Sequence, residues 1–167
     1  MGLDIAAYRQ IRLVGTEPDI ESYEDKYDWK KTDYIHPGIN GPEFHEHIGD
    51  LVAGGVYAYA ETMNFRAGSY SGYNQWRDEL ARYMLGVSAK EVWKSPDKYK
   101  HLPFYYLINF SDCEGVISGP VAEKLYHDFT EAQGRADQHK DSWWRELYAK
   151  WRQAFEFAND DGYVDFH

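Results

Sequence analysis

Strand-like patterns occur in four parts of the chain. Successive side chains of a strand point to opposite faces, so alternation of apolar and other residues indicates a strand, as does a short continuous apolar run. Such patterns cover residues 3–14, 56–67, 103–110 and the tail 163–167. The aromatic run Phe104–Phe110 predicts a buried strand, and residues 112–119 are expected to follow it as a turn or hairpin arm.

Helical spacing occupies much of the remaining chain. Apolar residues recur at intervals of three and four within residues 73–85, 120–135 and 142–158. Ser88 followed by Glu91 matches a capping box and predicts a further short helix that ends before Pro96. The last long helix carries an aromatic and apolar stripe that we expect to be buried, formed by Trp144, Leu147, Trp151 and Phe155.

These elements predict a single α+β domain over residues 1–167. Strands and helices do not alternate in the strict order that would force a parallel sheet. We therefore expect a mostly antiparallel sheet, built from the four strand regions and packed against about three long helices. A chain of 167 residues can bury one core, and no repeat or low-complexity linker divides it.

The segment from Phe65 to Arg77 is the main candidate for a binding site. It joins a predicted strand to a helix through Gly68 and Gly72, and the first backbone N–H groups of a helix lack intrahelical partners. Such a turn can hold an anion or a carboxylate. The alternative is a tight corner in which serine hydroxyls only cap the helix. The predicted ligand-binding residues are Arg66, Ser69, Tyr70, Ser71, Tyr73 and Arg77.

Two carboxylates, Asp112 and Glu114, directly follow the aromatic run. They are candidates for an acid and base pair, or for metal ligands if both ends of the chain return to the same sheet. Further oxygen and nitrogen donors would then come from Asp4, Asp165 or His167. The alternative is that both acids cap turns and helix ends, as aspartate often does.

Other candidate chemistry is weaker. His45 and His47 would share one side of an extended segment, which makes them weak candidates for a zinc site without a further positioned ligand. Cys113 lies between two acids, which disfavour a thiolate, so we expect a buried or half-buried structural thiol. The sequence indicates no cofactor.

The charge balance favours some partners over others. The chain has 18 basic and 28 acidic residues, a net charge of −10, which disfavours direct binding to nucleic acid. Fifteen tyrosines and six tryptophans supply aromatic area that suits both a core and a binding surface. One stretch with a single base is either a solvated face or a docking surface for a basic partner: Glu17, Asp19, Glu21, Glu24, Asp25 and Asp28.

Cysteine content and hydrophobic profile indicate a cytoplasmic protein. A single cysteine cannot form an internal disulfide, which fits a reducing compartment. The chain begins without the basic and apolar regions of a signal peptide, and no apolar run is long enough to span a membrane, so we expect no membrane association. Nothing in the pattern indicates an oligomeric state.

Several strings resemble a group of small uncharacterised proteins from bacteriophages and prophages. They are Met1–Ile5, Phe65–Arg77, Asp112–Ile117, Trp143–Phe155 and Val164–His167, and the likeness spans most of the chain. The resemblance implies a phage context and a bacterial host cell. It implies no activity and no catalytic residues.

Two functional hypotheses follow. The first is a non-enzymatic binding protein of phage or prophage origin that modulates or inhibits a host protein with a basic surface, using its acidic, tyrosine-rich surface. The alternative is a small hydrolase or anionic-ligand-binding protein that uses the Gly68–Tyr73 loop with Asp112 and Glu114.

Overall fold

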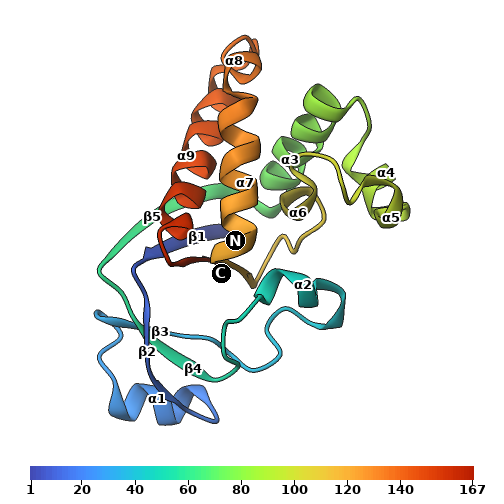
Figure 1. Ribbon diagram of the computed structural model, residues 1–167. Coiled ribbons are helices and arrows are strands. Elements are labelled where there is room, and N and C mark those ends of the chain that lie inside the picture. Colours follow the sequence, from blue (N-terminus) through green and yellow to red (C-terminus); the bar gives the residue numbers. More distant parts are fainter.

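The computed structural model, which describes residues 1–167, contains two antiparallel sheets and nine helices (Figure 1). The larger sheet has the strand order β5 (Glu61–Ser69), β1 (Gly2–Arg9), β7 (Tyr163–Phe166) and β6 (Gly115–Ser118). The smaller sheet has the order β2 (Arg12–Thr16), β4 (Gly55–Ala58) and β3 (Thr32–Tyr34). All strand pairs are antiparallel, which confirms the predicted α+β class.

The three long helices form where the sequence predicts them. They are α3 (Tyr70–Leu85), α7 (Gly119–Glu131) and α9 (Ser142–Asn159), and they pack on one face of the larger sheet (Figure 1). The shorter helices are α1 (Ile20–Lys26), α2 (His45–Ile48), α4 (Ala89–Lys94), α5 (Pro96–Tyr99), α6 (Tyr105–Ile108) and α8 (Gln133–Ala136), with a 3₁₀ turn at Pro42–Phe44. None of the helices has the length and apolar character required to cross a membrane.

The main core lies between the long helices and the larger sheet. The predicted stripe of α9 is buried there, and the ring of Trp151 contacts those of Phe65, Tyr73 and Phe166. The predicted cap of α4 is also present, since Ser88 Oγ accepts a hydrogen bond from the backbone N–H of Glu91. Helical spacing and capping chemistry therefore located these elements correctly.

Strand β7 separates this core from a second, smaller one. Side chains alternate between the two faces of a strand, so Val164 and Phe166 enter the main core while Tyr163 enters the other. We call β2, β3, β4 and α1 the small lobe (Figure 1). The second core lies between the small lobe and strands β6 and β7. The same alternation directs Tyr163 and Asp165 toward the small lobe.

Two predicted strands are each divided between the sheets. Residues 3–14 form β1 and β2, and residues 56–67 form β4 and β5. The first break occurs at Gln10, which has a φ of 50°, and the backbone N–H groups of Gln10 and Ile11 bond to residues 160 and 161 instead of a strand. The two breaks lie next to each other, since the backbone N–H of Ala60 donates to the carbonyl oxygen of Arg9.

The predicted strand at 103–110 is wrong. This run forms the single helical turn α6, preceded by Phe104 with a φ of 67°, and the backbone N–H of Phe104 donates to Asp128. A continuous apolar run fits a buried helix as well as a buried strand, and tertiary contacts decide between them. The strand that enters the larger sheet is β6, within the segment expected to be a turn or hairpin arm.

Candidate functional site

The side chains of the Phe65–Arg77 segment lie in different environments. Arg66 forms an ion pair with Asp4, with 2.9 Å between Nη1 and Oδ2. Ser69 Oγ accepts a hydrogen bond from the backbone N–H of Gly72 and so caps α3, and it lies 3.2 Å from Ser71 Oγ. These two contacts are those of the structural alternative, a capped strand-to-helix corner.

The remaining residues of that segment also have structural roles, with one exception. Tyr73 and Arg77 are buried, and the Arg77 guanidinium lies 5.0 Å from the centre of the Tyr73 ring. Arg77 Nη1 donates to the carbonyl of Phe110, which ties α3 to the end of the aromatic run. Tyr70 is the exception, because it lines a cavity described below.

The acids Asp112 and Glu114 are directed to different places. Asp112 accepts a hydrogen bond from Asn74 Nδ2 at 2.6 Å and so serves to anchor its loop to α3. Glu114 is exposed and lines the same cavity as Tyr70, together with Cys113. The predicted carboxylate pair therefore does not share a cleft. Cys113 is exposed, so the expectation of a buried or half-buried thiol is also wrong.

The two histidines of the weak zinc prediction do not form a pair. They lie on helix α2, where side chains two residues apart are separated by roughly 160° around the helix axis. His47 is buried, its Nε2 donates to the carbonyl of Tyr106 at 2.8 Å, and burial lowers its pKa to about 4. His45 is exposed. Across the chain, no group of three or more His, Cys, Asp or Glu side chains is arranged to hold a metal ion.

A cavity of about 500 Å³ lies where the small lobe meets the end of β7 and the loop before β6. We call it the junction cavity. Its walls come from α1, β3, the first residue of α3, the loop before β6 and the end of β7. Its twelve lining residues, none of them lysine or arginine, are Ile20, Tyr23, Asp33, Tyr34, His36, Ile39, Tyr70, Cys113, Glu114, Asp165, Phe166 and His167.

Two half-buried carboxylates, Asp33 and Asp165, are the main electrostatic feature of the junction cavity. Tyr163 Oη donates to Asp33 Oδ2 at 2.5 Å. Burial, and then the charge of Asp165, raise the pKa of Asp33 to about 7, and burial also raises the pKa of Asp165. His167 lies 3.5 Å from Asp165, and this contact raises the His167 pKa. The cavity therefore holds acidic groups in a site poorly solvated by water.

Aromatic rings form much of the rest of the wall. The rings of Tyr23 and Tyr34 stack with their centres 5.3 Å apart, and Tyr34 contacts His36 edge to face at 4.8 Å. Tyr163, which donates to Asp33 without lining the cavity, packs against Tyr8, and burial raises the pKa of both phenols. Carboxylates and the faces of aromatic rings both attract cations.

The raised pKa of Asp33 makes stability depend on pH. Between about pH 4 and pH 7 the folded chain keeps a proton on Asp33 that the unfolded chain releases, so stability falls as the pH rises through this window. Asp33→Asn removes this ionisation. The free energy of unfolding of the variant, minus that of the wild type, should be on the order of 1–3 kcal/mol larger at pH 8 than at pH 4. Urea unfolding of both proteins at the two pH values measures this difference.

Asp50→Asn is the control for this experiment, because Asp50 is exposed and lies away from the junction cavity. It should leave the pH profile of unfolding unchanged. A difference between Asp33→Asn and wild type that is the same at pH 4 and pH 8 would contradict the prediction.

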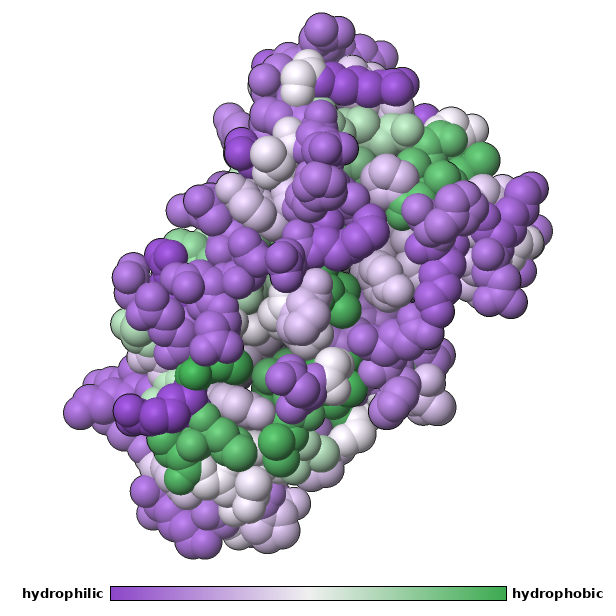
Figure 2. All heavy atoms as spheres, in the orientation of Figure 1, coloured by the Kyte–Doolittle hydropathy of each residue, from purple (hydrophilic) through white to green (hydrophobic).

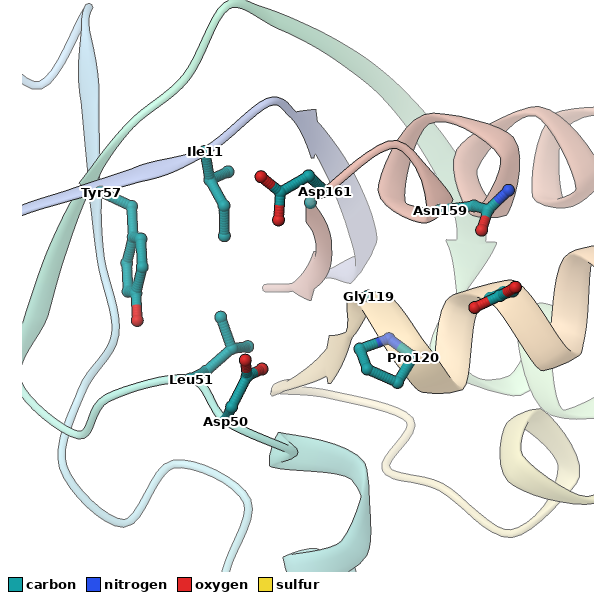
Figure 3. A pocket seen from close by; sticks show the side chains of 10 residues that line it. Ile11, Asp50, Leu51, Tyr57, Gly119, Pro120, Asn159 and Asp161 are labelled. Carbon is teal, nitrogen blue, oxygen red and sulfur yellow. The ribbon is translucent and has the colours of Figure 1, made fainter.

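A second cavity, of about 480 Å³, lies between the start of α7 and the turn after α9 (Figure 3). Its acids are Asp50, Glu123 and Asp161, all exposed, and Figure 3 shows Asp50 and Asp161 on opposite sides of the opening. Exposed carboxylates keep their hydration and gain little from a ligand. We therefore regard the junction cavity as the stronger candidate.

The surface of the small lobe is both apolar and acidic. Five of the eight large hydrophobic residues with high exposure lie on it or beside it, and Figure 2 shows hydrophobic atoms gathered there. They are Leu13, Val14, Ile20, Trp29 and Val52. The only base of α1, Lys26, is paired with Glu17. The exposed acids Glu21, Glu24 and Asp25 have no ion-pair partner.

Sequence reasoning found part of the junction cavity. Asp165 and His167 were considered as donors, and Tyr70 and Glu114 as site residues, but not in this combination. Asp33 and Tyr34, which line the cavity, and Tyr163, which donates to Asp33, were missed. The available signal was the alternation in the tail, which places Tyr163 and Asp165 on the same face of one strand.

Comparisons of the chain with protein-family models, curated proteins and solved structures give no match.

Proposed function

We propose that this chain is a non-enzymatic binding protein whose small lobe docks on a basic surface of another protein. The observation that supports this most directly is the combination of a projecting tryptophan with unpaired acids on one lobe. Trp29 is 71% exposed. Tryptophan is enriched among the residues that dominate binding energy, and unpaired acids favour and accelerate association with a basic partner.

The edge of the small sheet adds to this support. Strand β2 pairs with β4 on one side and has no strand on the other. Its residues Leu13 and Val14 are exposed, although unprotected apolar edges are usually avoided because they recruit other chains. An interface on the small lobe would cover this edge.

The identity of the partner is part of the proposal. The likeness to small phage and prophage proteins makes a bacterial host protein the first partner to seek, with the encounter in the cytoplasm. The partner surface should be rich in arginine and lysine. When the small lobe covers this surface, the activity of the partner should be modulated or inhibited.

The alternative of a small hydrolase or anion-binding protein has less support. Arg66 is engaged by Asp4, and Arg77 is buried with its guanidinium bonded to Phe110. Asp112 and Glu114 do not line one cavity. These contacts support the alternative less than they support docking through the small lobe.

The test is binding to a purified partner. The tagged chain is used to isolate proteins from bacterial extract, and each purified partner is then titrated against wild type and Trp29→Ala/Glu24→Lys. We expect the double variant to raise the dissociation constant at least about tenfold. Binding by the wild type should also weaken between about 50 and 300 mM salt, because exposed charges are screened.

The matched control is Trp143→Ala/Glu146→Lys on α9. Trp143 is 46% exposed and Glu146 is exposed. This variant therefore makes the same chemical changes near the start of α9, at the other end of the molecule from the small lobe (Figure 1). It should bind like the wild type. Equal loss in both double variants, or binding that is insensitive to salt, would rule out docking through the small lobe.

A further inference from the structure

We propose that the junction cavity receives a cationic side chain, the guanidinium of arginine or the ammonium of lysine, from the basic partner. This inference rests on the proposed function, since the partner supplies the side chain. The cavity is continuous with the proposed docking surface, because Ile20 and Tyr23 of α1 line its wall. A partner that covers the small lobe would therefore have the opening of the cavity at its interface.

The charges inside the cavity select a cation. Asp33, Asp165 and Glu114 line it, whereas no lysine or arginine does. Tyr163 donates one hydrogen bond to Asp33, and His167 lies against Asp165. The remaining carboxylate lone pairs can accept N–H donors, and a guanidinium carries five of them in a fixed planar arrangement.

The walls suit an organic cation more than a metal ion. Tyr23, Tyr34 and Tyr70 present aromatic surface, which attracts the delocalised charge and the methylene stem of such a side chain. No three acidic or imidazole side chains converge as a metal would require. A volume of about 500 Å³ is within the usual range of small-ligand sites.

Proton linkage provides a signature of this mode of binding. Other titratable groups act on the two carboxylates or on His167, or line the same cavity: Asp4, Tyr8, Tyr23, His36, Tyr59, Tyr70, Cys113 and Tyr163. A cation favours the ionised carboxylates, so binding releases protons from a site in which the pKa of Asp33 is about 7. Affinity should rise with pH, whereas an anion held by His167 would bind more tightly at low pH.

The experiment uses calorimetric titration of the full chain with N-acetyl-arginine amide. The uncharged probe N-acetyl-citrulline amide has nearly the same shape, and the capped pentapeptide Gly-Ser-Arg-Ser-Gly presents the same side chain on a polypeptide. We expect the arginine probe and the peptide to bind and the citrulline probe to bind at least about tenfold more weakly. Binding of the arginine probe should be tighter at pH 8 than at pH 6.

Two variants locate the site. Asp165→Asn keeps the shape of the side chain and removes its charge. It should raise the dissociation constant of the arginine probe at least about tenfold. Tyr70→Leu keeps an apolar side chain in the wall but removes the aromatic ring, and it should raise the dissociation constant of the arginine probe about threefold. Asp50→Asn, which removes one exposed acid from the second cavity, should bind like the wild type.

The outcomes separate this inference from the proposed function. Equal binding of both amino-acid probes, or an affinity unchanged by Asp165→Asn, overturns the cation site. Binding of the free probe but not of the peptide overturns the assignment to a partner side chain. The small-lobe variant Trp29→Ala/Glu24→Lys should leave the arginine probe unaffected. If that variant loses partner binding while the wild type does not bind the arginine probe, docking through the small lobe stands and the cation site in the junction cavity is rejected.

Discussion

Replacing Trp151 with alanine is expected to lower the free energy of unfolding by about 3–5 kcal/mol, the range of large aromatic truncations in cores. Trp151 is fully buried, and its ring centre lies 5.2 to 5.6 Å from those of Phe65, Phe166 and Tyr73. The side chain thus joins α9 to β5, β7 and α3, and alanine would leave a cavity between them. Chemical denaturation of wild type and variant measures the difference.

The control is Trp143→Ala on the same helix. Because Trp143 is 46% exposed, its truncation should cost less than about 1 kcal/mol. A cost of that size for Trp151→Ala as well would mean that the face of α9 carrying Trp151 is not packed in solution.

Gly162→Ala is expected to cost about 3 kcal/mol or to prevent folding. Gly162 lies between α9 and β7, where an added Cβ would be only 1.8 Å from the carbonyl oxygen of Tyr8 and 2.8 Å from its carbonyl carbon. Both are backbone atoms of the central strand β1, so no side-chain rotation can relieve the overlap. Thermal and urea unfolding of the purified variant would measure the loss.

Gly134→Ala is the matched control for this substitution. Gly134 lies on α8, and no atom from outside its own helical turn would come within 4 Å of the added Cβ. Alanine also favours a helix more than glycine does. Its stability should therefore equal or exceed that of the wild type, whereas a wild-type stability for Gly162→Ala would contradict the close approach of β1 to this turn.

Elements that are fixed by interactions within their own segment could be predicted from the sequence, whereas an element held by contacts to distant residues could not. The long helices were placed correctly because each carries its own apolar stripe, as α9 does with Trp144 and Trp151. The run at 103–110 was misassigned because its apolar residues are continuous, and its helical turn is held by a distant contact, from Phe104 to Asp128. No local pattern encodes that contact.

The candidate site was harder to predict for the same reason. A glycine- and serine-rich turn such as that after Phe65 is equally suited to hold a ligand or to cap a helix, and only the position of Asp4 shows that Arg66 is engaged. The junction cavity unites residues 33 and 165, which lie on strands of different sheets. Spacing along the chain cannot reveal such a pair.

Because the first and last strands are neighbours in the larger sheet, its assembly requires almost the entire chain. Strand β7 lies between β1 and β6, so β6 has no sheet partner until residues 163–166 have been synthesised. Pairings between residues so distant in sequence slow folding. Completion of this sheet, and with it formation of the junction cavity, is therefore a late step that follows synthesis of the long helices.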